Sequence, residues 1–206
     1  MIKLHGMDRS NYYCLAKACL LEKGMSYEAV DAMPSQDEDY LVKSPMGKVP
    51  CIETDEGFIS EAYAIADYLD QIQPERPLLP ANPFARGKAV ELCRHLELDV
   101  ELVARRCLPE AFFGVTVSDE VKAATQKDLK RGMTAVSRLV VCDPYIAGRE
   151  FCLADIYTFY VFGLASQIVQ KVFNEDLLAD LPQVKTLIGE LASRDCIREV
   201  EAAKGG

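Results

Sequence analysis

A proline-rich stretch divides this sequence into two parts that favour different folds. Four prolines fall within Gln73–Pro83, and proline removes a backbone donor and fixes φ, so no regular element runs through the stretch. Short strand-like runs precede it, and only helical patterns follow it. We therefore expect a domain at residues 1–73, a linker at 74–83 and a second domain at 84–206.

The first part predicts the element order β-α-β-α-β-β-α. The predicted strands are residues 1–5, 25–31, 49–53 and 57–59, and the predicted helices are residues 11–23, a short one within 34–44, and one from Glu61. A helix between the first two strands makes that pair parallel, whereas a tight turn makes the last pair antiparallel. Gly24 is expected to end the first helix, and Ser60 to cap the last one.

The second part predicts only helices. Their expected ranges are 84–113, 118–141, 152–170, 181–193 and 197–203. Pro109 is expected to bend or end the first of them. The third is strongly apolar, which favours a central position in a helical bundle.

Charge and cysteine content exclude several kinds of protein. The net charge of −9 disfavours binding to nucleic acids or anionic membranes, and no apolar run is long enough to cross a bilayer. The first five residues are too polar for a signal peptide, so we expect a cytoplasmic protein. Eight cysteines without a CxxC pair, and two histidines, predict buried thiols and no metal site.

Four blocks of sequence resemble one family. They are Ser10–Gly24 (SNYYCLAKACLLEKG), Ser44–Pro50 (SPMGKVP), Ile59–Ile65 (ISEAYAI) and Gly148–Asp155 (GREFCLAD). In this order they resemble conserved runs of the cytosolic glutathione transferase superfamily, with a bacterial-type, serine-type active site. The resemblance implies a thioredoxin-like domain that binds glutathione, followed by an all-helical domain that shapes the electrophile site.

The same resemblance makes Ser10 the predicted catalytic residue. A hydroxyl where the first strand passes into the first helix can donate to the glutathione sulfur, and the helix N-terminus adds partial positive charge. Serine is also a preferred helix cap, which is the competing interpretation. Tyr12 and Tyr13 are the alternative donors.

The resemblance also assigns the residues that hold glutathione. Val49 and Pro50 match a cis-proline step that would present the Val49 backbone to the cysteinyl part of glutathione. Glu61 would hold the γ-glutamyl ammonium, and Lys48 would pair with the glycyl carboxylate. Ala62 stands where the family has serine, so one hydroxyl donor to the γ-glutamyl carboxylate is missing.

The predicted function is a detoxifying transferase that conjugates glutathione to a small hydrophobic electrophile, without a prosthetic group and as a homodimer. Candidates for the electrophile pocket are Tyr12, Val103, Arg106, Leu108, Phe112 and Phe113. A glutathione-dependent isomerase, dehalogenase or peroxidase on the same fold remains an alternative. So does a non-catalytic binding or regulatory protein, which Asn11 and Ala62 favour.

Overall fold

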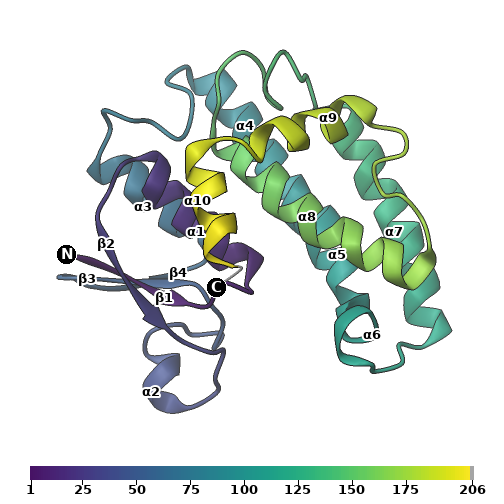
Figure 1. Cartoon of the computed structure of the whole chain (residues 1–206), viewed down its shortest axis with the longest axis horizontal. Coiled ribbons are helices and arrows are strands. Elements are labelled where there is room, and N and C mark those ends of the chain that lie inside the picture. The colour runs from purple at the N-terminus through teal and green to yellow at the C-terminus, as the bar shows by residue number, and fades with distance from the viewer. Residues whose placement is uncertain (205–206) are drawn as a thin grey trace. The chain divides into compact units, whose positions relative to one another are not determined.

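The computed structural model describes residues 1–204, which form two compact units (Figure 1). One unit comprises residues 1–79 and the segment from Ser193, and the other comprises residues 80–192. The limit between Leu79 and Pro80 falls within the proline-rich stretch. The functional division into domains at 1–73 and 84–206 remains a prediction. Within the described residues, no helix is both long and apolar enough to cross a membrane.

The first unit is built on a four-stranded sheet in the order β2-β1-β3-β4. The strands are β1 (Ile2–Gly6), β2 (Tyr27–Asp31), β3 (Cys51–Thr54) and β4 (Gly57–Ser60). β1 runs parallel to β2 and antiparallel to β3, and β3 and β4 form an antiparallel hairpin. These pairings confirm the topology expected from the sequence.

Three helices cover one face of this sheet, and α2 (Glu38–Leu41) lies on the other (Figure 1). The three are α1 (Asn11–Glu22), α3 (Ala62–Ile72) and α10 (Asp195–Ala203). α1 packs against both α3 and α10. The fully buried side chains of Leu4, Leu15, Ile52, Ile65 and Leu69 form the core.

The predicted cap of α3 was wrong by one residue. Ser60 is still part of β4, where it pairs with Cys51 across the hairpin, so it cannot also begin the helix. Glu61 takes the cap position with φ +72° and makes no side-chain capping bond.

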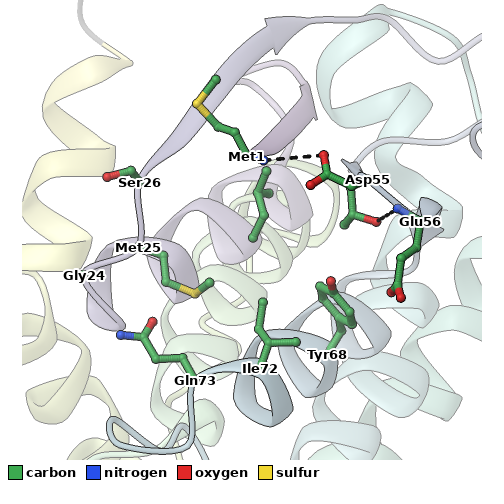
Figure 2. Close-up of a pocket in the computed structure, with 11 residues that line it drawn as sticks. Met1, Gly24, Met25, Ser26, Asp55, Glu56, Tyr68, Ile72 and Gln73 are labelled. Atoms are coloured by element: carbon green, nitrogen blue, oxygen red, sulfur yellow. Dashed lines mark hydrogen bonds and ion pairs between the residues drawn. The ribbon is translucent and has the colours of Figure 1, made fainter.

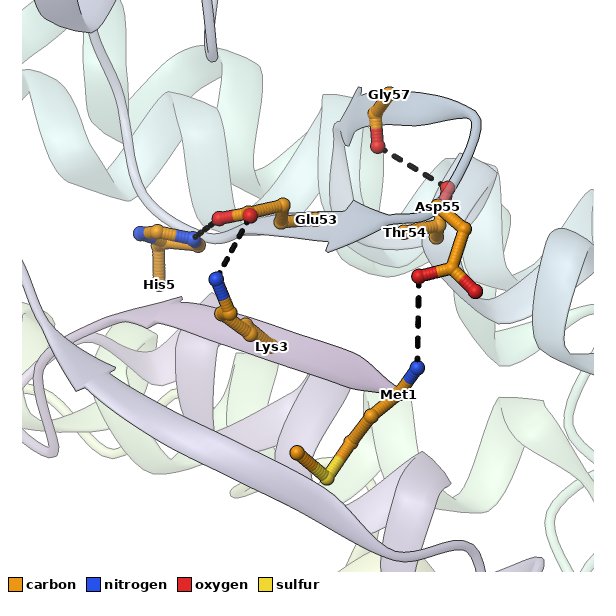
Figure 3. A network of polar contacts seen from close by, with 7 residues as sticks. All are labelled: Met1, Lys3, His5, Glu53, Thr54, Asp55 and Gly57. Atoms are coloured by element: carbon orange, nitrogen blue, oxygen red, sulfur yellow. Dashed lines mark hydrogen bonds and ion pairs between the residues drawn. The ribbon is translucent and has the colours of Figure 1, made fainter.

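A polar network ties β1 to β3 (Figure 3). Glu53 accepts hydrogen bonds from Lys3 Nζ at 2.8 Å and pairs with His5 Nε2 at 3.0 Å. These contacts, the one from Lys3 first, hold the pKa of the Glu53 carboxyl below its usual range. The network therefore fixes the register of two strands that are distant in sequence.

Lys23 is fully buried at the end of α1 and holds the proline-rich stretch. Its Nζ contacts Asp70 Oδ1 at 3.2 Å and donates to the carbonyls of Gln73 at 2.8 Å and Arg76 at 2.7 Å. Asp70 Oδ1 also accepts from the Leu78 N–H at 2.6 Å. A buried ammonium is tolerated when its donors are satisfied in this way, so the stretch is fastened to the first unit.

The second unit begins with a broken helix where the sequence predicted a continuous one at 84–113. Its pieces are α4 (Pro83–His95), a π-helical segment η1 (Leu96–Glu101), α5 (Leu102–Ala104), a 3₁₀ turn η2 (Arg105–Cys107) and α6 (Leu108–Phe113). Pro109 lies in the first turn of α6, where a missing N–H costs nothing, so the expected break at this proline is confirmed. Hydrophobic spacing alone does not distinguish a π-helical turn from an α-helical one.

The other helices of this unit are α7 (Asp119–Ser137), α8 (Leu153–Phe173) and α9 (Pro182–Leu191). α8 packs on α4, α9 and η1, which confirms its predicted central position. Asp155 is fully buried and accepts from the backbone N–H of Cys152 at 2.9 Å and of Ile146 at 2.8 Å. Cys152 and Asp155 therefore form a structural capping box at the start of α8.

Candidate functional site

The predicted site residues of the first unit converge on one edge of the sheet. Antiparallel pairing places the end of β1 and the end of β4 beside the start of β3, because His5 and Ser60 both pair with Cys51. The segment with Ser10 follows β1, Lys48–Pro50 precede β3, and Glu61 and Ala62 follow β4. Three separate segments of sequence thus meet at the edge where α1 and α3 begin.

Ser10 is the N-cap of α1, which is the role that the sequence analysis gave as the alternative to catalysis. Its Oγ accepts a hydrogen bond from the Tyr13 N–H at 3.3 Å, and its carbonyl accepts from the Cys14 N–H at 2.9 Å. Capping uses an oxygen lone pair and not the hydroxyl proton, so it is compatible with donation to another group. The first turn of α1 carries no acidic residue to offset its partial positive charge.

The two alternative donors differ in exposure. Tyr13 is 3% exposed, and its ring lies against Gly6, where a Cβ would come within 2.3 Å of the ring. Burial raises the pKa of the Tyr13 hydroxyl, so it is a weak proton donor to a thiolate. Tyr12 is half-buried.

Cys14 does not contribute a nucleophile to this edge. Its side chain is fully buried in α1, and its Sγ donates to the Asp8 carbonyl at 3.2 Å. Burial raises the pKa of the thiol to about 11. A buried thiol that stays protonated is a packing residue, as the sequence indicated.

The segment before β3 is a tightly held turn. The Val49–Pro50 peptide bond is cis, as the resemblance predicted. Gly47 has φ +64°, and a Cβ there would come within 2.1 Å of the Ser35 carbonyl oxygen, so only glycine fits. The Lys48 N–H donates to Ser44 Oγ at 3.2 Å.

Sequence reasoning missed Tyr40, which supports this turn from α2. Its hydroxyl donates to the Lys48 carbonyl at 3.2 Å. Residues 34–44 read only as a polar loop with a short helix, and no spacing in the sequence links Tyr40 to Lys48. The Lys48 side chain itself is exposed and forms no ion pair with any residue in 1–204.

Glu61 and Ala62 lie at the start of α3. The positive φ of Glu61 is unusual for a residue with a side chain, and such strain concentrates at functional sites. The first turn of α3 carries no acidic residue and receives no side-chain cap. Ala62 is the first residue of α3 and is 6% exposed, so its own N–H is one of the first N–H groups of the helix.

The candidates for the electrophile pocket in the second unit have different surroundings. Val103 is 6% exposed and belongs to the unit's core, and Arg106 is paired with Asp128 at 2.7 Å. Phe112 and Phe113 are 39% and 71% exposed, and Lys171 Nζ lies 3.9 Å from the centre of the Phe112 ring. Leu108 is half-buried, so among these candidates the two phenylalanines are the most exposed apolar side chains.

These features define a class: a thioredoxin-like unit with an anion-attracting edge, followed by a helical unit. The family model described as "Glutathione S-transferase, N-terminal domain" matches residues 4–77. A curated glutathione S-transferase of Pseudomonas putida is 41% identical over 204 residues, which cover 99% of this chain and 93% of the relative. The chain therefore belongs to the glutathione S-transferase family of enzymes.

Two solved structures share the fold. The ternary complex of BphK, a bacterial GST, aligns with a TM-score of 0.80 and 26% identity, over 99% of this chain and 100% of that one. A glutathione transferase homologue from sulfitobacter, solved with bound glutathione, aligns with a TM-score of 0.77 and 19% identity, over 99% and 98% of the two chains. At that identity the second likeness shows the fold alone.

Proposed function

We propose that this chain conjugates glutathione to a small hydrophobic electrophile and that Ser10 activates the thiol. The observation that carries the proposal is the convergence of two helix N-termini, those of α1 and α3, whose first turns carry no acidic residue, on one sheet edge beside the Val49–Pro50 turn. Such an edge favours a ligand with negative charge at two separated points. Glutathione, with a thiolate and a γ-glutamyl carboxylate, is a ligand of this kind.

Ser10 supplies the chemistry of activation. A free thiol with a pKa of about 8.5 is only a few per cent ionised at neutral pH, so donors that favour the thiolate raise the rate. The Ser10 hydroxyl donates to the sulfur while its oxygen keeps the capping bond to the Tyr13 N–H. The thiolate then forms a carbon–sulfur bond with the electrophile, whose leaving group departs with the electron pair.

The remaining edge residues orient glutathione. The Val49 N–H and C=O pair with the cysteinyl backbone in the manner of an added strand. Glu61 takes the γ-glutamyl ammonium, the Ala62 N–H takes the neighbouring carboxylate, and Lys48 meets the glycyl carboxylate. Orientation of the thiolate is itself a source of rate enhancement.

We also propose that the protein acts in the cytoplasm, in detoxification, as a homodimer and without a prosthetic group. Family membership supports this proposal. Light scattering tests the assembly, since a monomer at working concentration would contradict it.

Two measurements test the proposed activity. The purified chain should be retained on immobilised glutathione, and it should accelerate the reaction of glutathione with 1-chloro-2,4-dinitrobenzene. Retention without turnover of this or other aryl halides would favour an isomerase, dehalogenase or peroxidase. Absence of both would favour a binding or regulatory protein.

A further inference from the structure

The first unit has a concave surface at the edge of its sheet opposite the proposed glutathione site (Figure 2). It is an open depression with a volume of about 550 Å³, which is within the usual size of small-molecule sites. It is lined by the start of β1, the residues after α1, the β3–β4 turn and the end of α3. The proposed glutathione site lies at the other end of each of these elements.

The floor of this pocket is apolar and adaptable. Met25, Tyr68 and Ile72 line it together with Met1, and Figure 2 shows the side chains of Tyr68 and Ile72 side by side on α3. Ile72 is 46% exposed and Met1 is 78% exposed, so apolar surface remains open to a ligand. Unbranched methionine side chains fit ligands of irregular shape, and the face of a tyrosine ring attracts cations.

One side of the pocket carries negative charge. Asp55 and Glu56 come from the β3–β4 turn, and the turn itself is held by Thr54, whose Oγ1 donates to the Gly57 carbonyl at 3.1 Å and accepts from the Glu56 N–H at 3.2 Å. Asp55 faces the α-ammonium of Met1 at 3.7 Å (Figure 3). Glu56 forms no ion pair with any residue in 1–204, so one negative charge remains uncompensated.

The carboxylates and the apolar floor of the pocket favour an organic cation over a metal ion. A metal ion is a poorer match: hard cations need six or more oxygen ligands, and residues 1–204 contain no cluster of three His, Cys, Asp or Glu side chains.

We propose that this pocket binds a small molecule that carries an ammonium group on an aromatic or short apolar body. The apolar body packs on Met25, Tyr68 and Ile72, and the ammonium lies near Glu56 and Asp55. The site is independent of the proposed conjugation chemistry, because none of its residues lies at the glutathione edge.

The test uses three phenyl compounds of similar size and different charge. Phenethylamine (cationic), 2-phenylethanol (neutral) and 3-phenylpropionate (anionic) are titrated into the full chain labelled with ¹⁵N, and amide shifts are followed. We expect phenethylamine to bind most tightly and to shift residues 54–56 and 68–73. Glu56→Gln should weaken it about two- to fivefold, the effect of one solvent-exposed charge pair.

A matched variant controls for net charge. Glu75→Gln removes the same charge from an exposed residue outside the pocket lining and should leave phenethylamine affinity unchanged. Equal affinity for the three compounds, equal effects of the two variants, or no shift at residues 54–56 and 68–73 would each overturn the proposal. The rate of glutathione conjugation should be the same in both variants. A negative result in the phenethylamine titrations therefore leaves the proposed function intact.

Discussion

Ser10 Oγ accepts a hydrogen bond from the Tyr13 N–H, so one hydroxyl caps α1 at the position where the thiol is proposed to bind. The cap uses the oxygen, and catalysis would use the proton. Capping and donation to the thiol can therefore be separated by experiment, because some substitutions at position 10 affect helix stability less than they affect donation.

Ser10→Ala and Ser10→Gly both remove the hydroxyl donor. Loss of one donor to a developing anion lowers kcat about 10²- to 10³-fold, and we expect both variants to fall by this amount. Because the donor lowers the thiol pKa, its loss should shift the rise of the pH–rate profile upward, toward the free-thiol value of about 8.5. Steady-state kinetics from pH 6 to 9 measures both effects.

Stability provides the control for this pair. Alanine at a cap costs about 1 kcal/mol, whereas glycine costs only a few tenths, so urea denaturation should separate the two variants although their turnover is similar. Ser118→Ala removes the equivalent cap of α7, whose Oγ accepts from the Val121 N–H at 3.4 Å, and should lower stability without changing kcat. If kcat fell in proportion to the loss of stability in all three variants, Ser10 would act only as a helix cap.

Ala62→Ser should tighten glutathione binding. The substitution restores a hydroxyl at the start of α3, and a hydrogen bond to a charged group contributes about 1.5–3 kcal/mol, or roughly ten- to a hundredfold in KM for glutathione. Ala64→Ser places the same hydroxyl on an exposed position of the same helix and should change nothing. If both variants kept the parent KM, the γ-glutamyl carboxylate would have to lie elsewhere.

The sequence predicted the topology, because alternating strand and helix patterns are strong local signals. The cis Val49–Pro50 step and the residues proposed for the site came from the family resemblance, which short blocks of sequence carry. The support of Lys48 by Tyr40 depends instead on tertiary packing, as does the breaking of the predicted 84–113 helix at η1. At Gly132, α7 approaches the Asp99 carbonyl so closely that a Cβ would lie 2.1 Å from it, and no periodicity reveals such a contact.

Glu61 holds a positive φ at a cost that glycine would not incur. A residue with a Cβ in a sparsely populated backbone region of this kind costs about 1–3 kcal/mol, so Glu61→Gly should be more stable than Glu61→Gln by about that amount. Both variants lose the carboxylate charge and should raise the KM for glutathione. Thermal unfolding and glutathione titration, run on the same two samples, separate backbone strain from ligand binding; equal stability would show that position 61 is unstrained.

Lys23→Met should destabilise the first unit strongly. The substitution leaves the buried Asp70 carboxylate and the carbonyls of Gln73 and Arg76 without the ammonium that satisfies them, and breaking one side of a buried ion pair costs about 3–5 kcal/mol. Lys185→Met breaks an exposed pair, Lys185–Asp176 at 2.9 Å, and should cost less than about 1 kcal/mol. Urea denaturation measures both. A cost for Lys23→Met as small as for Lys185→Met would mean that water replaces the ammonium and that the proline-rich stretch is held by its apolar contacts, Leu78 and Leu79, alone.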